Sequence, residues 1–306
     1  MNFVADNRVA NMLSAYSHGG EFHIAEVLTD ALIDSAKMLP FLFLAFLLME
    51  FIEHHTGERL VRFLKKTGGG AGGALVGAVA GCVPQCGFSV AASNLYAGRI
   101  VTFGTLIAVF ISTSDEAVPV LLAHPDMLGT IWKLIVVKIV IAALAGIAAD
   151  AVIRIFRLKI NDDEAISEIC SESGCGCGNH GIWYSSLKHT LSIFVFILIV
   201  NVLLGAVMAY AGEEAVSSFL KGMGFLQPAV AGIVGLIPNC AASVVITELY
   251  AGGALTFGSA VSGLCTGAGV GLAVLFRTNK NIRENLAATG TIYAVGVISG
   301  TIINLF

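Results

Sequence analysis

Apolar runs of about 20 residues recur along the whole chain, and each is long enough to cross a bilayer as a helix. The 306 residues are 56% hydrophobic and 12% charged, and the mean hydropathy is +0.85. Soluble domains carry about one quarter charged residues, so roughly half of the expected charge is missing. The runs also lack the short alternation of an outer-membrane barrel. The sequence therefore predicts an all-α polytopic membrane protein, with the lipid bilayer as its partner and no role for nucleic acid.

The second half of the chain repeats the first at an offset of 154 positions. The segment NLYAGRIVTFG (94–104) aligns with ELYAGGALTFG (248–258), and seven of the eleven positions are identical. In the same register Pro84 aligns with Pro238. Chance similarity between apolar segments does not give so many identities in one register. We interpret the pattern as an internal duplication.

Eight segments are apolar enough to enter the membrane. Two of them are rich in glycine and interrupted by a Pro-amide-Cys triplet, so each either crosses the membrane or turns back inside it. The other six have the length of full spans. The two interrupted segments are 70–96 and 228–250, and the six spans are 31–52, 100–123, 129–153, 187–210, 253–276 and 286–306.

The positions of Lys and Arg favour two segments that turn back. Cytoplasmic loops carry an excess of positive charge, and with two re-entrant segments twelve Lys and Arg residues share one side, against Arg8 and Lys221 on the other. With two crossing segments the split is roughly even. Each half then has three spans and one Pro-broken re-entrant hairpin, which gives ten helical segments in an inverted repeat, a recurring transporter architecture. The twelve residues are Arg59, Arg62, Lys65, Lys66, Arg99, Arg154, Arg157, Lys159, Lys188, Arg277, Lys280 and Arg283.

This arrangement divides the chain into four parts. They are an extracytoplasmic N-terminal segment (1–28), a first transmembrane repeat (29–156), a cytoplasmic Cys-rich linker (157–184) and a second repeat (185–306). We expect a multi-pass protein of the cytoplasmic (inner) membrane with both termini outside the cytoplasm. Because the N-terminal segment lacks the features of a signal peptide, we expect insertion to use the internal spans.

The two Pro-amide-Cys triplets, at 84–86 and 238–240, are candidate binding elements. Proline breaks a helix, and non-helical backbone at membrane depth is tolerated where protein buries it or where it lines a watery cavity. Amide oxygens, thiols and freed carbonyls from two such tips would form a mixed oxygen and sulfur site. The alternative is that the prolines are packing kinks and the cysteines small buried hydrophobes. The occurrence of both triplets at equivalent repeat positions favours the site.

The stretch FISTSDEAVPVL (110–121) places Asp115 and Glu116 inside a span, where carboxylates are costly and usually functional. Adjacent carboxylates cannot share one helix face, so we expect one to face the pathway and the other to pair. Lys138, at a similar depth in the next span, is the expected counter-ion, and a purely structural pair with a carboxylate is the alternative. The aligned segment 264–275 has lost both acids. The halves are therefore not expected to be equivalent in function.

These patterns define three sets of candidate residues and no resident cofactor. The predicted substrate-binding residues are Pro84, Gln85, Cys86, Ser89, Ser112, Thr113, Ser114, Asp115, Glu116, Pro238, Asn239, Cys240, Ser243 and Thr266, of which Asp115, Glu116, Gln85, Asn239, Cys86 and Cys240 are the predicted metal ligands. The candidate coupling residues are Lys138, Glu50 and Asp34. A second candidate metal site in the linker comprises Cys170, Cys175, Cys177 and His180. Cys-x-Cys with a nearby His suits soft metals, although a Gly/Ser linker with incidental cysteines explains this pattern equally well.

Several long stretches together resemble a known family. They are DSAKMLPFLFLAFLLMEFIEHH (34–55), VPQCGFSVAASNLYAGRIVTFGTLIAVFISTSDEAVPVLLAHP (83–125) and PNCAAS (238–243) with the LYAGGALTFG that follows it. The family is that of manganese transporters, also described as ten-helix heavy-metal exporters, and it is distantly akin to the arsenic permeases. The resemblance covers nearly the whole chain and implies pathway roles for the two triplets and for residues 112–116. Linkers in such proteins are often rich in histidine, whereas this one is rich in cysteine, so the metal stays open.

We therefore expect a secondary transporter that exports divalent transition-metal ions, either Mn²⁺ or a heavy metal. Proton exchange through the carboxylates is the expected coupling, because the sequence has no nucleotide-binding loop. The alternative is a permease for a thiophilic metalloid of the arsenic type, or for a sulfur compound, that uses Cys86 and Cys240. We do not expect an enzyme, since the sequence has no paired ligand and base motif such as H-E-x-x-H. The expected partners are the bilayer, the transported ion and protons, and the sequence is compatible with a homo-oligomer.

Overall fold

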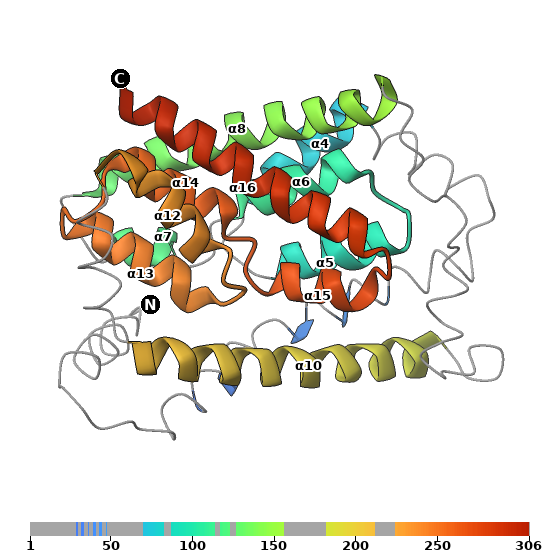
Figure 1. The fold of residues 1–306 in the computed structure, drawn as a ribbon. Helices are drawn as coiled ribbons and strands as arrows, with labels where there is room; N and C mark the ends of the chain where they lie inside the picture. The colour runs from blue at the N-terminus through green and yellow to red at the C-terminus, as the bar shows by residue number, and fades with distance from the viewer. Residues whose placement is uncertain are drawn as a thin grey trace, which may run out of the picture.

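A computed structural model describes residues 70–82, 87–113, 117–122, 127–155, 182–211 and 224–305, with a few scattered positions between 29 and 47. The regular structure of these residues is entirely helical (Figure 1). The helices are α4 (Gly70–Ala80), α5 (Gly87–Ala97), α6 (Phe103–Ser112), α7 (Ala117–Leu122), α8 (Leu128–Ile155), α10 (Ile182–Ala211), η2 (Gly224–Leu226), α12 (Gln227–Gly235), α13 (Cys240–Ala251), α14 (Phe257–Thr266), α15 (Val270–Thr278) and α16 (Ile282–Leu305).

Within the described residues, four helical segments are long and apolar enough to cross a membrane. They are Phe103–Leu122, Leu128–Ile155, Phe257–Thr278 and Ile282–Leu305. The outer faces of α8 and α16 expose large apolar side chains, among them Trp132, Leu144 and Ile302, as expected of helices that face lipid. The predicted all-α polytopic membrane fold is confirmed. The predicted spans 129–153, 187–210 and 286–306 appear as α8, α10 and α16.

The first glycine-rich segment folds as a helical hairpin beside α6. A Cβ added at Gly77 of α4 would meet Thr105, and one added at Gly81 would meet Ser112, so α4 runs parallel to α6. Helix α5 then returns, and a short turn joins it to the start of α6. The tip of the hairpin therefore lies at the C-terminal end of α6, and the far end of α5 lies at the N-terminal end of α6.

The second half repeats these contacts at the same offset. Helices α12 and α13 form the matching hairpin beside α14, where a Cβ at Gly235 would meet Thr266. The long helices also cross in the same way. Gly104 of α6 touches the backbone of Gly146 on α8, and Gly258 of α14 touches Gly300 on α16. Small residues at a crossing let two membrane helices approach closely, and the duplication preserved them at both crossings.

Two of the six predicted full spans remain long and apolar enough to cross a membrane, but each contains a break that the sequence interpretation did not locate. In the span 100–123, α6 ends at Ser112 and the next described residue, Thr113, is not helical. In the span 253–276, residues 267–269 separate α14 from α15. The second break contains Gly269, whose φ of 55° and ψ of −148° are suited to glycine alone. The second break was missed because mean hydropathy does not register a break made of two glycines and an alanine. The two breaks occupy aligned positions in the repeat.

The two halves pack against each other reciprocally. Helix α5 of the first half contacts α15 of the second, and α13 of the second contacts α7 of the first. Ser89, in the first turn of α5, lies next to Gly271, in the first turn of α15, and Ser93 Oγ, one turn further along α5, donates to the Gly271 carbonyl at 2.7 Å. Beyond their ends, Arg99 meets Glu284. Helices α5 and α15 therefore run parallel, and the broken helix α6–α7 runs antiparallel to the broken helix α14–α15.

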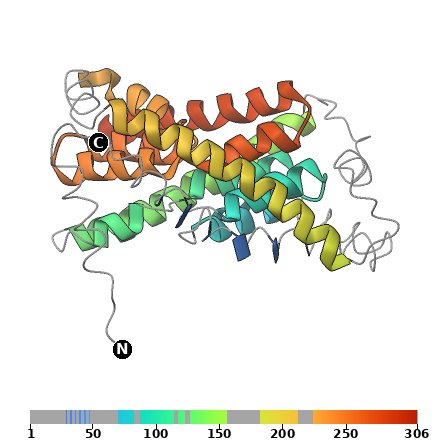
Figure 2. The ribbon, with the colours of Figure 1, turned by 90° about the horizontal axis from the view of Figure 1, so that it is seen from below.

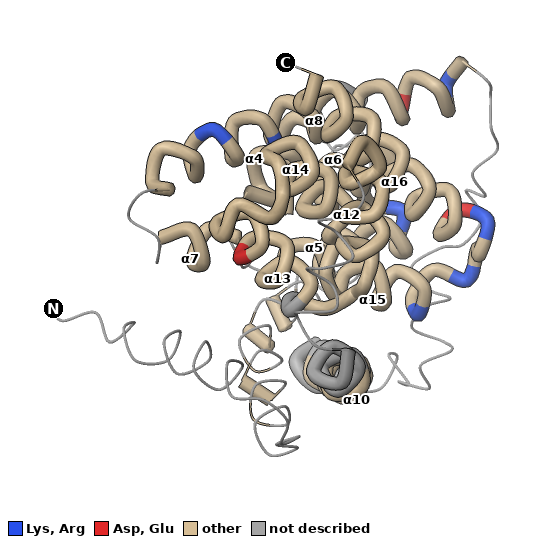
Figure 3. The backbone as a smooth tube through the Cα atoms, turned by 60° about the vertical axis from the view of Figure 1, so that its left-hand side comes forward, with Lys and Arg blue, Asp and Glu red and all other residues tan. Residues whose placement is uncertain are grey.

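Helix α10 lies along one side of this bundle, as Figures 1 and 2 show. Its buried residues Ile193 and Ile197 pack on Val90, Val270 and Val274. In Figure 3 a group of Lys and Arg positions gathers around the turn from α15 to α16, and others lie along α8. This turn belongs to the side that the distribution of positive charge assigns to the cytoplasm.

Candidate functional site

The tips of the two hairpins lie beside the breaks of the two divided helices. Gly81, where α4 ends, is so close to the end of α6 that a Cβ there would lie 2.1 Å from Ser112 Oγ. Gly235, where α12 ends, would bring a Cβ 2.3 Å from Thr266 Oγ1. Helix ends carry unpaired backbone groups and partial charges. Each half thus places the ends of several helices at one level of the bundle.

Hydroxyl groups satisfy several of these backbone carbonyls. Ser112 Oγ donates to the carbonyls of Val109 (3.1 Å) and Gly77 (3.4 Å), and Thr113 Oγ1 also donates to Val109, at 2.7 Å. In the second half Thr266 Oγ1 takes the role of Ser112 and donates to two glycine carbonyls, each at 2.9 Å. All three side chains are buried. These predicted site residues therefore line the helix breaks and hold their backbone in place.

Two predicted site residues, Ser89 and Ser243, occupy aligned positions of the repeat and lie where the hairpins meet the second broken helix. Ser89 is fully buried, and a Cβ added at Gly271 would lie 2.6 Å from its Cβ. The Oγ of Ser243, at the start of α13, would lie 3.3 Å from a Cβ added at Gly267. The starts of α5 and α13 are therefore both close to the α14–α15 break. The structure brings Ser89 and Ser243 to the same break.

Lys138 connects the two breaks directly. Its side chain is fully buried on α8, and its ammonium donates to the carbonyl of Thr113, which caps α6, and to the carbonyl of Leu264, in the last turn of α14, at 2.7 Å. A cation is stabilised at the C-terminal end of a helix, where the partial charge is negative. Here one ammonium serves the C-terminal ends of helices from both halves. The sequence placed Lys138 at this depth but did not indicate these carbonyl partners.

Several predicted residues lie outside the described part of the chain. They are Asp34, Glu50, Pro84, Gln85, Cys86, Ser114, Asp115, Glu116, Cys170, Cys175, Cys177 and His180. The pairing of Lys138 with a carboxylate and the metal site in the linker therefore stay predictions. In the second triplet Asn239 is buried, Pro238 is half-buried, and Cys240 is the first residue of α13. The second triplet thus does interrupt its hairpin, as predicted.

Two cysteines near the breaks were missed by the sequence interpretation. Cys82 ends the first turn after α4 and is partly buried, and Cys265 is fully buried in the last turn of α14. Cys265 directly follows Leu264, whose carbonyl accepts from the Lys138 ammonium. The two cysteines were missed because neither belongs to a Pro-amide-Cys triplet. The available signal was their neighbours, because Cys82 follows Gly81, which aligns with Gly235, and Cys265 precedes Thr266, which aligns with Ser112.

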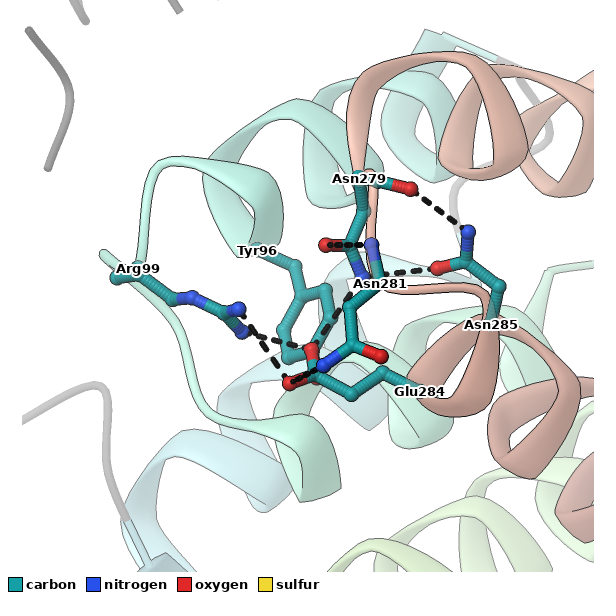
Figure 4. Close-up of polar contacts among 6 residues, drawn as sticks. All are labelled: Tyr96, Arg99, Asn279, Asn281, Glu284 and Asn285. Carbon is teal, nitrogen blue, oxygen red and sulfur yellow. Dashed lines mark hydrogen bonds and ion pairs between the residues drawn. The ribbon is translucent and has the colours of Figure 1, made fainter. Parts of the chain in front are cut away.

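A second polar cluster joins the two halves at the ends of α5 and α15 (Figure 4). Glu284, in the first turn of α16, accepts hydrogen bonds from Arg99 and from the Tyr96 hydroxyl, both at 2.8 Å. Asn281 Nδ2 donates to the same carboxylate at 2.9 Å, and Asn279 Nδ2 donates to it at 3.3 Å. Burial lowers the pKa of Arg99, but the hydrogen bond and charge of Glu284 more than offset this and raise that pKa above its usual value. The cluster lies away from the breaks and links the halves structurally.

The comparison with known proteins agrees with this architecture. A family model described as "Putative, 10TM heavy-metal exporter" matches residues 20–215. The matched range includes the first hairpin, the polar run at 112–116, Lys138 and the Cys-rich linker. No curated protein and no solved structure matches the chain. Because the family match spans more than half of the 306 residues, this multi-pass membrane protein belongs to the family of ten-transmembrane-helix heavy-metal exporters.

Proposed function

We propose that the protein is a secondary transporter that exports a divalent transition-metal ion through the centre where its hairpin tips and helix breaks meet. The observation that carries the proposal is the placement of Gly81 beside Ser112 and of Gly235 beside Thr266, with Lys138 joining the two breaks. Discontinuous helices near the middle of the membrane form the substrate and ion sites of many transporters. Membership in an exporter family favours transport over catalysis.

The ligands we propose follow from the chemistry of the residues at the breaks. Asp115 and Glu116 come directly after the described end of α6, two and three residues beyond Thr113. Together with Gln85 and Asn239 they would offer oxygen ligands that suit Mn²⁺, whereas thiols suit softer ions. Cys86 and Cys240 are the proposed thiol ligands. Proton exchange through the carboxylates would drive export against the metal gradient.

The course of the helices supports the inverted repeat that we propose. The broken helices α6–α7 and α14–α15 occupy equivalent positions in the two halves and run antiparallel. Equivalent helices of an inverted repeat cross the membrane in opposite directions in the same way. Basic residues near the ends of α5 and α15, such as Arg99 and Lys280, then belong to the cytoplasmic face. In this orientation both termini lie outside the cytoplasm and the linker lies inside, in the cytoplasmic membrane of the cell.

A thiophilic metalloid or a sulfur compound is the second candidate substrate. The observation that favours it is the presence of two further thiols beside the breaks: Cys82 follows Gly81, and Cys265 lies between Leu264, whose carbonyl accepts from Lys138, and Thr266. Thiols in the wall of a pathway could pass such a substrate from one half to the other. A cationic centre would also attract an anionic form of the substrate. The two candidates predict different effects of removing the cysteines.

Flux into proteoliposomes that contain a metal-responsive dye would test the proposal. Mn²⁺, Fe²⁺, Zn²⁺, Co²⁺ and Cd²⁺ would each be added to vesicles with and without a pH gradient. We expect saturable flux of at least one ion, accompanied by proton movement, and a large loss of flux in Asp115→Asn or Glu116→Gln. Unchanged transport in both variants would exclude the carboxylate role.

A double variant would separate the two substrate classes. Cys86→Ser/Cys240→Ser should keep the transport of a hard ion such as Mn²⁺ and should lose the transport of a thiophilic substrate. Each variant must elute as a single species of wild-type thermal stability before its flux is interpreted. The absence of flux for every divalent ion from such folded protein would contradict metal export and favour the metalloid or sulfur compound.

A further inference from the structure

We infer that the Lys138 ammonium fills a monovalent-cation site between the two halves, so that a tethered cation stands where other transporters with broken helices bind a dissociable one. Unwound carbonyls and the C-terminal ends of half-helices are the groups that coordinate Na⁺ in such transporters. The Lys138 ammonium is held by two groups of this kind, the carbonyls of Thr113 and Leu264. An ammonium is a compact point charge with three donors, which makes it a suitable replacement for a small cation.

The backbone hydrogen bonds around the α14 break show that Lys138 replaces a missing backbone donor. In a continuous helix the Ala268 N–H would donate to the Leu264 carbonyl, four residues earlier. Here the Ala268 N–H donates to the Thr266 carbonyl instead, at 2.8 Å. The Leu264 carbonyl accepts from Lys138 at 2.7 Å. The break therefore frees a carbonyl, and the ammonium binds it.

The first half has the same organisation at the end of α6. The Thr113 N–H and its hydroxyl both donate to the Val109 carbonyl. The carbonyl of Thr113 itself lies beyond the last helical turn and accepts from Lys138. Two helix C-terminal ends, one from each half, thus face a single positive charge. Without that charge, the two negative ends would repel each other across the interface.

The repeat indicates that this charge is not a general requirement of the fold. Lys138 of α8 aligns with Ile292 of α16, which is also fully buried. An apolar side chain therefore fills the equivalent position in the second half. The positions of the second half that align with Asp115 and Glu116 also carry no acid. The lysine and the acids occur together in one half only, as expected of parts of one functional centre.

One functional consequence concerns how transport is driven. A site that is already filled by a tethered ammonium needs no Na⁺. The wild-type protein should therefore bind no Na⁺ at this site, and its transport should not depend on Na⁺. This consequence rests on the proposed transport function, but the cation site itself can be tested without any measurement of metal flux.

The test compares wild type, Lys138→Ala and Lys138→Met in detergent, with the melting temperature measured over a range of NaCl concentrations at constant ionic strength in choline chloride. Lys138→Ala empties the site, whereas Lys138→Met keeps the bulk of the side chain and removes the charge. We expect wild type to show no dependence on Na⁺. Lys138→Ala should melt at a lower temperature and recover with saturable dependence on Na⁺ or methylammonium, by on the order of 5 °C at saturation. Lys138→Met should melt at a lower temperature without recovery.

Two outcomes would overturn the inference. Equal melting temperatures of Lys138→Ala in Na⁺, methylammonium and choline would show that the carbonyls do not form a cation site. Saturable binding of ²²Na⁺ to the wild type that is lost in Lys138→Met would show that the ammonium does not fill the site, and this measurement stays informative if Lys138→Ala cannot be purified. If Na⁺ restores the melting temperature of Lys138→Ala but the wild type moves no metal, the cation site is supported and the proposed cargo is rejected.

Discussion

Arg99 and Glu284 form an ion pair across the two halves of the protein, with Nη1 and Oε2 2.8 Å apart. The residues are 185 positions apart in the sequence, and their side chains are 9% and 10% exposed. Arg99 lies in the turn that ends the first hairpin, where its φ of 56° is unusual for a residue with a side chain. The pair therefore fixes the end of the hairpin to the start of α16.

Glu284→Gln should destabilise the protein, because it leaves the guanidinium of Arg99 largely buried without its charged partner. Removing one member of a buried pair leaves an uncompensated charge, and we expect a cost on the order of 2 kcal/mol. The raised pKa of Arg99 means that the stability contributed by the pair is present at neutral pH and is lost as the pH rises through that pKa. A lower melting temperature in detergent would be the readout.

The neighbouring Arg283 provides the matched control, since it is exposed on the same turn of α16. Arg283→Gln should leave the melting temperature nearly unchanged. The double variant Arg99→Gln/Glu284→Gln should lose less stability than the sum of the two single variants. Strict additivity would mean that the two side chains do not stabilise each other.

Asp150→Asn should be tolerated and Asp150→Ala should not. The carboxylate of Asp150 accepts from the Gly104 N–H at 2.7 Å and from the Thr102 hydroxyl at 2.8 Å. The aligned residue Asn304 accepts from the Gly258 N–H at 3.1 Å, so an amide oxygen is sufficient in the second half. Alanine would leave the N–H of Gly104 without this acceptor, at a cost of about 1–3 kcal/mol. A melting temperature of Asp150→Asn that is equal to or lower than that of Asp150→Ala would contradict this prediction.

Gly300→Ala should disrupt the crossing of α14 and α16. A Cβ at Gly300 would lie 2.4 Å from the carbonyl oxygen of Gly258, and forcing extra atoms into a packed interface costs about 1–3 kcal/mol. Gly290 on the same helix has no heavy atom within 4 Å of an added Cβ. Gly290→Ala should therefore leave the melting temperature unchanged or raise it slightly. A similar loss of stability in both variants would show that helix propensity, and not the crossing, decides the outcome.

Gly269→Ala should impair both folding and transport, because it acts on the break between α14 and α15. The backbone of Gly269 has a φ of 55°, which costs an L-residue on the order of 1–3 kcal/mol. Gly267 in the same break has a φ of −72°, so Gly267→Ala is the milder control. Flux per folded molecule, measured in proteoliposomes, should fall further for Gly269→Ala. Equal flux in both variants would show that the geometry of this break is not needed for transport.

The sequence alone determined the class of this protein and its internal repeat. Hydropathy identifies membrane helices because the bilayer excludes polar side chains, and a duplication is visible as identities in one register. The Pro-amide-Cys triplet at 238–240 correctly marked the break in its hairpin, because proline interrupts a helix whatever its surroundings. Ser112 was predicted from the polar run at 112–116 and Thr266 from its alignment with Ser112, and both do lie at the breaks.

The tertiary structure decided which of these elements meet. No local signal shows that Lys138 binds the carbonyl of Leu264, 126 residues away, or that Arg99 pairs with Glu284. The break at Gly269 was missed because two glycines in an apolar run are compatible with either a continuous or a broken helix. Such a break is stable only when groups from other helices bind the freed backbone, as Lys138 does for Leu264. That information is contained in long-range packing and not in the segment itself.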